Sequence, residues 1–265
     1  IYYNEQDSLR DESELLFKFR GNLNVKPKVI TRCIYVKKNN FYRNRDVERT
    51  QKHLSSIRLF KSVNVYFKPA ADSSVNSLDC FIEISQNKLQ SYSFNIEGTN
   101  SGSDYGADVL VTYRNNNLFK GSEIFSIKLN GALEMNKTFE ENPEKKIFNS
   151  YEYGTEAKIE FPQFILPFKM DKFYKKYQPK TILRAGYKFQ KTPYFSNPVT
   201  FATFGYYWRG SRWVNHIINP IEIRGVKYFN FDPAFKEYIH SRYIYEYSFQ
   251  DYYISALSYS YTYND

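Results

Sequence analysis

The sequence predicts a small α+β domain followed by antiparallel strands of a transmembrane β-barrel. Two observations indicate this fold. After the first 88 residues the chain changes to repeated alternating segments of about 10 residues separated by Gly, Asn, Pro or charged turns, which is typical of barrel strands. Aromatic residues make up 19% of the chain, while the mean hydropathy is −0.62. Because no apolar run approaches the ~18 residues of a membrane helix, a helical membrane protein is excluded.

The first part divides into a polar, acidic linker at residues 1–12 and a domain at residues 13–88. Alternation over Leu15–Arg20 predicts a strand, and Pro27 favours a helix over a strand for the next segment. A second helix begins at the candidate cap Asn44. Two alternating strands, 63–67 and 78–84, complete a β-α-α-β-β order, which we expect to place two helices over a three-stranded sheet. An exposed sheet edge could accept an extended peptide; a simple spacer is the alternative.

Residues 89–265 are expected to hold about eight strands with one lipid-facing and one lumen-facing side. Apolar positions such as Phe125, Ile127 and Leu129 alternate with polar ones such as Ser126 and Lys128. We predict a lumenal polar network of Asp108, Arg114, Lys128, Glu156, Glu160, Arg184 and Lys188. A soluble sandwich also alternates, so alternation leaves that fold open. Aromatics at 206–208 and 259–263 fit the interfacial girdles of a membrane barrel.

The charge and the sequence motifs limit the classes of partner and function that the sequence allows. The net charge of +9 comes from basic residues that we interpret as spread along the whole chain, so we expect lipopolysaccharide phosphates or acidic headgroups as partners and no nucleic acid. Cys33 and Cys80 are expected to be packed thiols. We find no catalytic, cofactor-binding or metal-binding motif, and predict that the chain is not an enzyme. A short amphipathic helix is predicted at 232–240.

The segment NIEGTNSGSDYGADVLVTYRNNNLFKGSEIFSIKLNGALE, Asn95–Glu134, resembles the start of the barrel in the BamA/TamA outer-membrane protein assembly family. Within it, RNNNLFKGSEI (Arg114–Ile124) resembles the turn that joins barrel strands two and three. The β-α-α-β-β order is similar to a POTRA domain, which favours helix for Pro27–Tyr35. EFPQFILPF (Glu160–Phe168) is similar to the end of the fourth strand in a TamA-like lipoprotein branch.

The resemblance implies an α+β POTRA domain followed by the N-terminal half of a larger barrel, in the outer membrane of a Gram-negative bacterium with the POTRA domain in the periplasm. It also implies an assembly factor that inserts unfolded β-barrel clients, with a periplasmic accessory or TamB-like partner, in contact with outer-membrane lipid and lipopolysaccharide. The first barrel strand would pair with the client through Ser91, Ser93, Phe94, Asn95, Ile96 and Gly98. The alternative is a POTRA-barrel secretion transporter or a passive pore.

Overall fold

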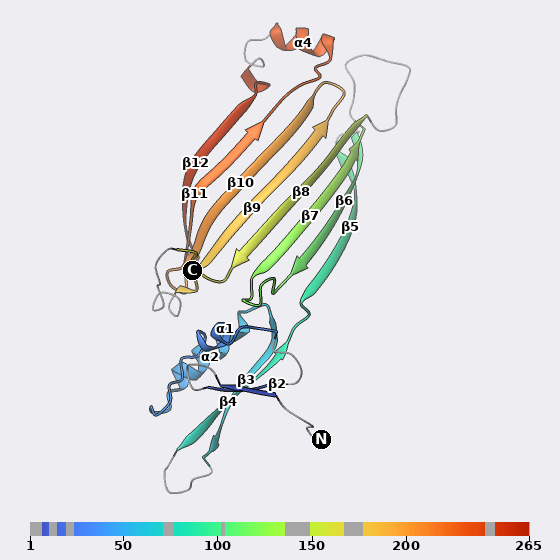
Figure 1. Cartoon of the computed structure of the whole chain (residues 1–265). Coiled ribbons are helices and arrows are strands. Elements are labelled where there is room, and N and C mark those ends of the chain that lie inside the picture. Colours follow the sequence, from blue (N-terminus) through green and yellow to red (C-terminus); the bar gives the residue numbers. More distant parts are fainter. Residues whose placement is uncertain are drawn as a thin grey trace. The chain divides into compact units, whose positions relative to one another are not determined.

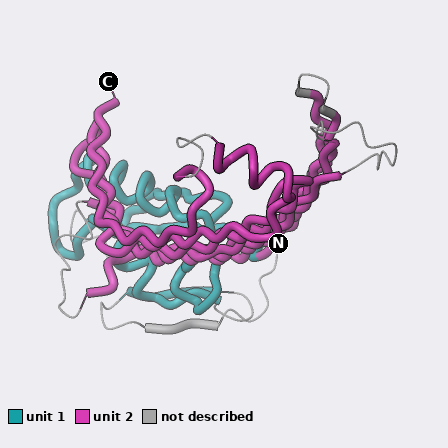
Figure 2. Tube along the Cα trace, turned by 90° about the horizontal axis from the view of Figure 1, so that it is seen from above, with its two compact units in different colours: residues 1–89, 116–123, 168–176 teal, residues 90–115, 124–167, 177–265 magenta. Residues whose placement is uncertain are grey.

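The computed structural model describes residues 7–10, 15–19, 24–70, 77–101, 104–135, 149–166, 177–241 and 247–264. The chain divides into two compact units, coloured separately in Figure 2. Unit 1 comprises Ile1–Leu89, Asn116–Glu123 and Phe168–Lys176. Unit 2 comprises Gln90–Asn115, Ile124–Pro167 and Tyr177–Asp265.

Unit 1 follows the expected element order but not the expected sheet. It contains β1 (Asp7–Arg10), β2 (Leu16–Phe19), α1 (Pro27–Thr31), α2 (Asn44–Ser55), β3 (Phe60–Pro69) and β4 (Leu78–Gln86). Among the described residues β2 pairs with β1, and β3 pairs with β4, so two two-stranded sheets replace the predicted three-stranded sheet. Part of the predicted linker is therefore strand β1. Pairing across the short β1–β2 connection loses less loop-closure entropy than pairing with the distant β3.

The core of unit 1 lies between the helices and the first half of the β3–β4 hairpin. Leu54 and Leu59 are fully buried, and Ile30, Cys33 and Val63 pack with them. Pro27 occupies the first turn of α1, as the sequence predicts, because its missing N–H needs no partner there.

Two local predictions for unit 1 were wrong. Cys80 is exposed, because it pairs with Phe67 towards the tip of the β3–β4 hairpin, beyond the part of the hairpin that packs into the core. Asn44 is not the cap of α2: the extended residue Arg43 precedes the helix, and the Asn44 amide instead donates to Glu48 at 2.9 Å.

Several polar groups at the centre of unit 1 are paired with one another. The Tyr35 backbone N–H donates to Thr50 Oγ1 at 3.0 Å, and that hydroxyl donates to the Asp46 carbonyl at 2.7 Å. The Tyr35 hydroxyl lies 3.2 Å from His53 Nδ1. Burial raises the pKa of Tyr35 above its ordinary value, with a smaller contribution from Cys33.

Unit 1 also contains the loop Asn116–Glu123, which lies between two strands of unit 2 in sequence. The Asn116 N–H donates to the Leu89 carbonyl at 2.8 Å, and the Lys26 N–H donates to the Lys120 carbonyl at 2.8 Å. The Glu123 carboxylate accepts the N–H groups of Phe119 and Gly121 at 3.1 and 2.9 Å. The loop belongs to the Asn-rich segment that the sequence assigns to the turn between the second and third barrel strands, and the structure places it between the corresponding strands, β6 and β7.

Unit 2 is built on an eight-stranded antiparallel sheet in chain order, which confirms the expected number of strands. Its strands are β5 (Gln90–Ser101), β6 (Asp104–Asn115), β7 (Ile124–Glu134), β8 (Ser150–Phe161), β9 (Lys180–Lys191), β10 (Ser196–Arg209), β11 (Val214–Val226) and β12 (Tyr252–Tyr263). Figures 1 and 2 show the strands side by side in a curved sheet. The edges of the sheet are β5 and β12. The fourth strand, β8, ends at Phe161, within the predicted segment 160–168, of which residues 167 and 168 lie outside the described residues.

An aromatic cluster surrounds α4 (Pro233–His240), the predicted short helix. The Asp232 carboxylate caps α4 by accepting the N–H groups of Ala234 and Phe235 at 3.0 and 3.1 Å. The rings of Phe195, Phe235 and Phe249 contact one another, with centroids 5.3–6.2 Å apart. In Figure 1, α4 lies beyond the ends of β11 and β12.

Candidate functional site

The register of the sheet gathers the predicted apolar positions on one face. Directly opposite residues in an antiparallel pair project to the same side, and Phe94, Val111 and Leu129 are opposite one another across β5, β6 and β7. These side chains are not buried: Phe94 is 64% exposed and Leu129 is 50% exposed. The apolar face of the sheet therefore covers no core among the described residues.

The opposite face carries charge and is less exposed. Along β8 the side chains of Glu152, Glu156 and Glu160 are only 22%, 25% and 17% exposed, while Tyr151 and Tyr153, on either side of Glu152 in sequence, are exposed on the other face. A soluble sandwich buries its apolar face and exposes its polar face. Strand β8 shows the reverse arrangement.

Among the described residues five ion pairs lie on this polar face, four between neighbouring strands of β7–β9 and one within β8. Glu156 lies 3.5 Å from Arg184 and 4.0 Å from Lys128. Glu160 lies 2.7 Å from Lys158 and 3.9 Å from Lys180. The Lys188 ammonium lies 2.7 Å from Glu152, which also accepts the Asn130 amide at 3.1 Å. Each carboxylate of β8 is thus neutralised by a cation from β8 itself or from a neighbouring strand.

The predicted polar network is therefore brought together in part. Lys128, Glu156, Glu160, Arg184 and Lys188 form ion pairs, whereas Asp108 and Arg114 share the same face without an ion pair among the described residues. Asp108 is opposite Glu97, and the Arg114 Nε atom is buried without a hydrogen-bond partner within the described part of the chain.

Sequence reasoning missed several members of the polar face. Glu152, Lys180 and Asn130 were not singled out, because their partners become neighbours only through the strand register. A second polar group was also missed: the Asn219 amide donates to Ser258, whose hydroxyl donates to Glu222, both at 3.0 Å. The alternation of polar residues on β11 and β12 was the available signal.

Aromatic residues gather near both ends of the apolar face. The cluster at the end where β5 begins stacks Trp208 on His216, with centroids 4.8 Å apart, and His216 Nδ1 lies 2.9 Å from the Tyr259 hydroxyl. Of the aromatics predicted at 206–208 and 259–263, Tyr206, Trp208, Tyr259, Tyr261 and Tyr263 lie on this face, whereas Tyr207 lies on the polar face and donates to Asn215 at 2.8 Å. At the other end Tyr153 packs on Phe189 at 5.2 Å, a cluster that was not predicted.

The spacing of the two clusters is compatible with an apolar band between interfaces. On β9, Phe189 belongs to one cluster, and Thr181, eight residues away, is opposite Tyr206 in the other. Eight residues of strand span about 27 Å. At the strand tilt of about 40° common in membrane barrels this is roughly 20 Å along the membrane normal, close to the ~25 Å apolar band of such proteins.

The first strand, β5, presents a free edge. It pairs with β6 along its whole length, Gln90 opposite Asn115 through Ser101 opposite Asp104, and has no neighbour on its other side within the described chain. The six predicted client-pairing residues all lie on it. Ser91, Ser93 and Asn95 share the polar face, while Phe94 and Ile96 share the apolar face and are exposed.

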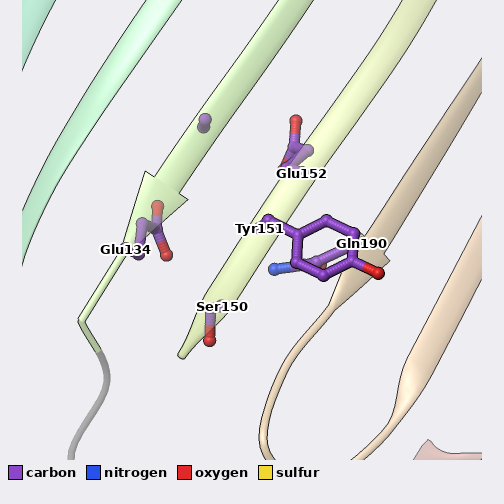
Figure 3. A pocket seen from close by; sticks show the side chains of 6 residues that line it. Glu134, Ser150, Tyr151, Glu152 and Gln190 are labelled. Carbon is purple, nitrogen blue, oxygen red and sulfur yellow. The ribbon is translucent and has the colours of Figure 1, made fainter. Parts of the chain in front are cut away.

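Within the part of the chain that the structure describes, no cavity of ligand size accompanies these surfaces. A small hollow between the ends of β7, β8 and β9 is lined by Glu134, Ser150, Glu152 and Gln190 (Figure 3), and it has room for about one water molecule. Among the described residues no group of three or more His, Cys, Asp or Glu side chains is placed to hold a metal ion. No helix in the described ranges is long and apolar enough to cross a membrane.

No family model matches the chain. No curated protein is significantly similar to it. Its function therefore has to be argued from the surfaces of the sheet.

Proposed function

We propose that this chain is part of an outer-membrane protein assembly factor of a Gram-negative bacterium. Unit 1 would be a periplasmic POTRA-type domain, and unit 2 would be the first strands of a membrane barrel. The observation that carries the proposal is the exposed apolar face of the eight-stranded sheet opposite a half-buried, ion-paired polar face. A water-filled interior and a lipid exterior satisfy both faces at once.

The free edge of β5 is the proposed site of client pairing. In a bilayer each unpaired backbone N–H or C=O group costs several kcal/mol, so a strand that pairs with the edge is strongly favoured. The alternation of Asn95 with Phe94 and Ile96 selects an incoming strand of the same period, polar on one side and apolar on the other. Unfolded β-barrel proteins supply such strands, and the pairing needs no covalent chemistry.

Gly98 is suited to a seam that opens. A Cβ atom added there would meet no atom within 4 Å, so a larger residue fits without a clash. Replacing Gly with Val would restrict the backbone conformations available at this position. Gly98→Val is therefore expected to slow client assembly while leaving the fold intact, and unchanged assembly would count against a moving seam.

A secretion transporter or passive pore is the second candidate. The ion-paired face of β7–β9 favours it, because charged side chains lining a barrel interior hold a water-filled path. A wide, steady conductance in planar bilayers together with one dedicated exported partner would support this candidate.

Depletion of the protein in cells separates the two functions. The assembly factor predicts lower folded levels of many different outer-membrane barrels. The transporter predicts normal barrels and the loss of one secreted protein. Restoration of barrel levels by the wild-type protein, but not by Gly98→Val, would assign the defect to β5.

A further inference from the structure

The excess positive charge of the chain is concentrated in one segment, contrary to the even spread inferred from the sequence. Residues 24–61 contain 11 Lys and Arg but only two acidic residues, Asp46 and Glu48, which gives this segment a net charge of +9. The remaining residues contain 26 basic and 26 acidic side chains and are neutral as a whole. The segment comprises α1, α2, their connections and the first two residues of β3, all in unit 1.

All of these basic residues except Arg32 are exposed. On α2, Arg45, Arg49 and Lys52 are exposed at i, i+4 and i+7, a spacing that places them on one side of the helix. The buried residues Thr50 and Leu54 face the core from the other side. These three basic side chains therefore form a basic stripe along one side of the helix, with the exposed Glu48 beside it.

The loop that leads into this helix carries an exposed aromatic tip. In the sequence KKNNFYRNR, residues 37–45, Phe41 is 90% exposed. The neighbouring ring of Tyr42 packs edge-on against Phe67, with centroids 5.0 Å apart, which anchors the loop to the β3–β4 hairpin. Phe41 thus projects from an anchored loop, flanked by Lys37, Lys38 and Arg43.

We propose that the basic aromatic loop, residues 37–45, and the basic stripe of α2 bind the surface of an anionic lipid bilayer. Phe41 would enter the interface, and the Lys and Arg side chains would contact headgroup phosphates. Proteins that bind single-stranded nucleic acid stack successive bases on several aromatic rings. In residues 37–45 the ring of Tyr42 packs against Phe67, so Phe41 is the one ring of this loop that projects without such a contact among the described residues. The choice of a bilayer also rests on the proposed membrane location of unit 2.

The test uses the full chain in detergent-free nanodiscs of phosphatidylcholine, titrated with phosphatidylcholine vesicles with or without phosphatidylglycerol. In a Cys80→Ser background, where the remaining Cys33 is buried, an environment-sensitive dye is attached at Asn40→Cys or, as a control on β3, at Asn64→Cys. The dye at position 40 is expected to shift to the blue only with phosphatidylglycerol and to lose the shift in high salt. The dye at position 64 is expected to show no shift.

Charge variants measure the contribution of the patch. Each basic residue near an anionic surface contributes about a fivefold gain in binding, so Lys37→Gln with Arg45→Gln is expected to require about 25-fold more lipid. The matched pair Lys18→Gln with Lys88→Gln removes two exposed charges outside the segment and is expected to change binding less than twofold. Phe41→Ser is expected to abolish the blue shift.

Three results would overturn the proposal: no shift at position 40, an equal shift with neutral vesicles, or equal losses in the two charge-variant pairs. Displacement of the vesicles by a single-stranded oligonucleotide at lower concentration would assign the patch to nucleic acid instead. The proposed function is tested by a different measurement. If the purified chain stays monomeric in buffer without detergent, unit 2 is not a membrane sheet and the proposed function is refuted. The lipid-binding proposal can then still be tested by titrating that detergent-free chain with vesicles.

Discussion

A lysine placed on the apolar face of the sheet distinguishes lipid from water as its surroundings. Leu129 is the central residue of β7 and is 50% exposed, and its neighbour Asn130 projects to the polar face. In a soluble protein a half-exposed position usually tolerates Lys within about 0.5 kcal/mol. At the midplane of a bilayer the same substitution costs about 2–4 kcal/mol. Leu129→Lys is therefore expected to destabilise the bilayer-inserted protein by about 3 kcal/mol.

Asn130→Lys is the matched control one residue away. The Asn130 amide already donates to Glu152, so an ammonium group there meets a carboxylate and is expected to change stability by less than about 1 kcal/mol. Urea unfolding of both variants in vesicles, followed by tryptophan fluorescence, measures the two free energies. Equal costs at the two positions, or no cost at Leu129, would refute the assignment of the apolar face to lipid.

Three further predictions address the polar face, unit 1 and the first hairpin. Glu156→Gln is expected to lower the free energy of unfolding by about 1 kcal/mol, because two cations lose their carboxylate, whereas Asp108→Asn should have little effect; equal effects would contradict the ion-pair assignment. The folded chain retains the Tyr35 proton at a pH where the unfolded chain has released it, so the free energy of unfolding should fall as the pH rises above about 10. Tyr35→Phe should remove that part of the fall in a pH series of unfolding curves. Identical curves for the wild type and the variant would contradict the raised pKa of Tyr35. Gly106→Val should lower the free energy of unfolding by about 1–3 kcal/mol, because its Cβ would lie 3.1 Å from the Leu133 carbonyl oxygen. Gly98→Val should lower it by less than about 1 kcal/mol in the same unfolding assay. The reverse order would contradict the open surroundings of Gly98 on β5.

The strands of unit 2 could be predicted from the sequence because a period of two fixes the face of each side chain. Once one residue such as Leu129 is assigned to the apolar face, the rest of β7 follows. The partners across strands could not be predicted, because they depend on the register. Alternation along the strands therefore placed Glu160 and Lys188 in the polar network. It did not show that Lys188 pairs with Glu152, because this contact depends on the register of β8 and β9.

The small domain shows the limits of local patterns more clearly. Helix α1 followed from Pro27, but the pairing of β2 with β1 did not, because four-residue strands carry too little pattern to choose a partner. The concentration of charge in residues 24–61 was accessible from the sequence, since counting charges in a window rather than over the whole chain would have found it.

The most direct test of the central claim is site-specific photocrosslinking in living cells from position Asn95 at the free edge of β5. Position Lys158, in the interior strand β8, serves as a control with both neighbours already paired. The proposed assembly factor predicts that position 95, but not position 158, captures several different nascent outer-membrane barrels. Capture of a single secreted partner, or only of another strand of the same protein, would contradict a working insertion seam.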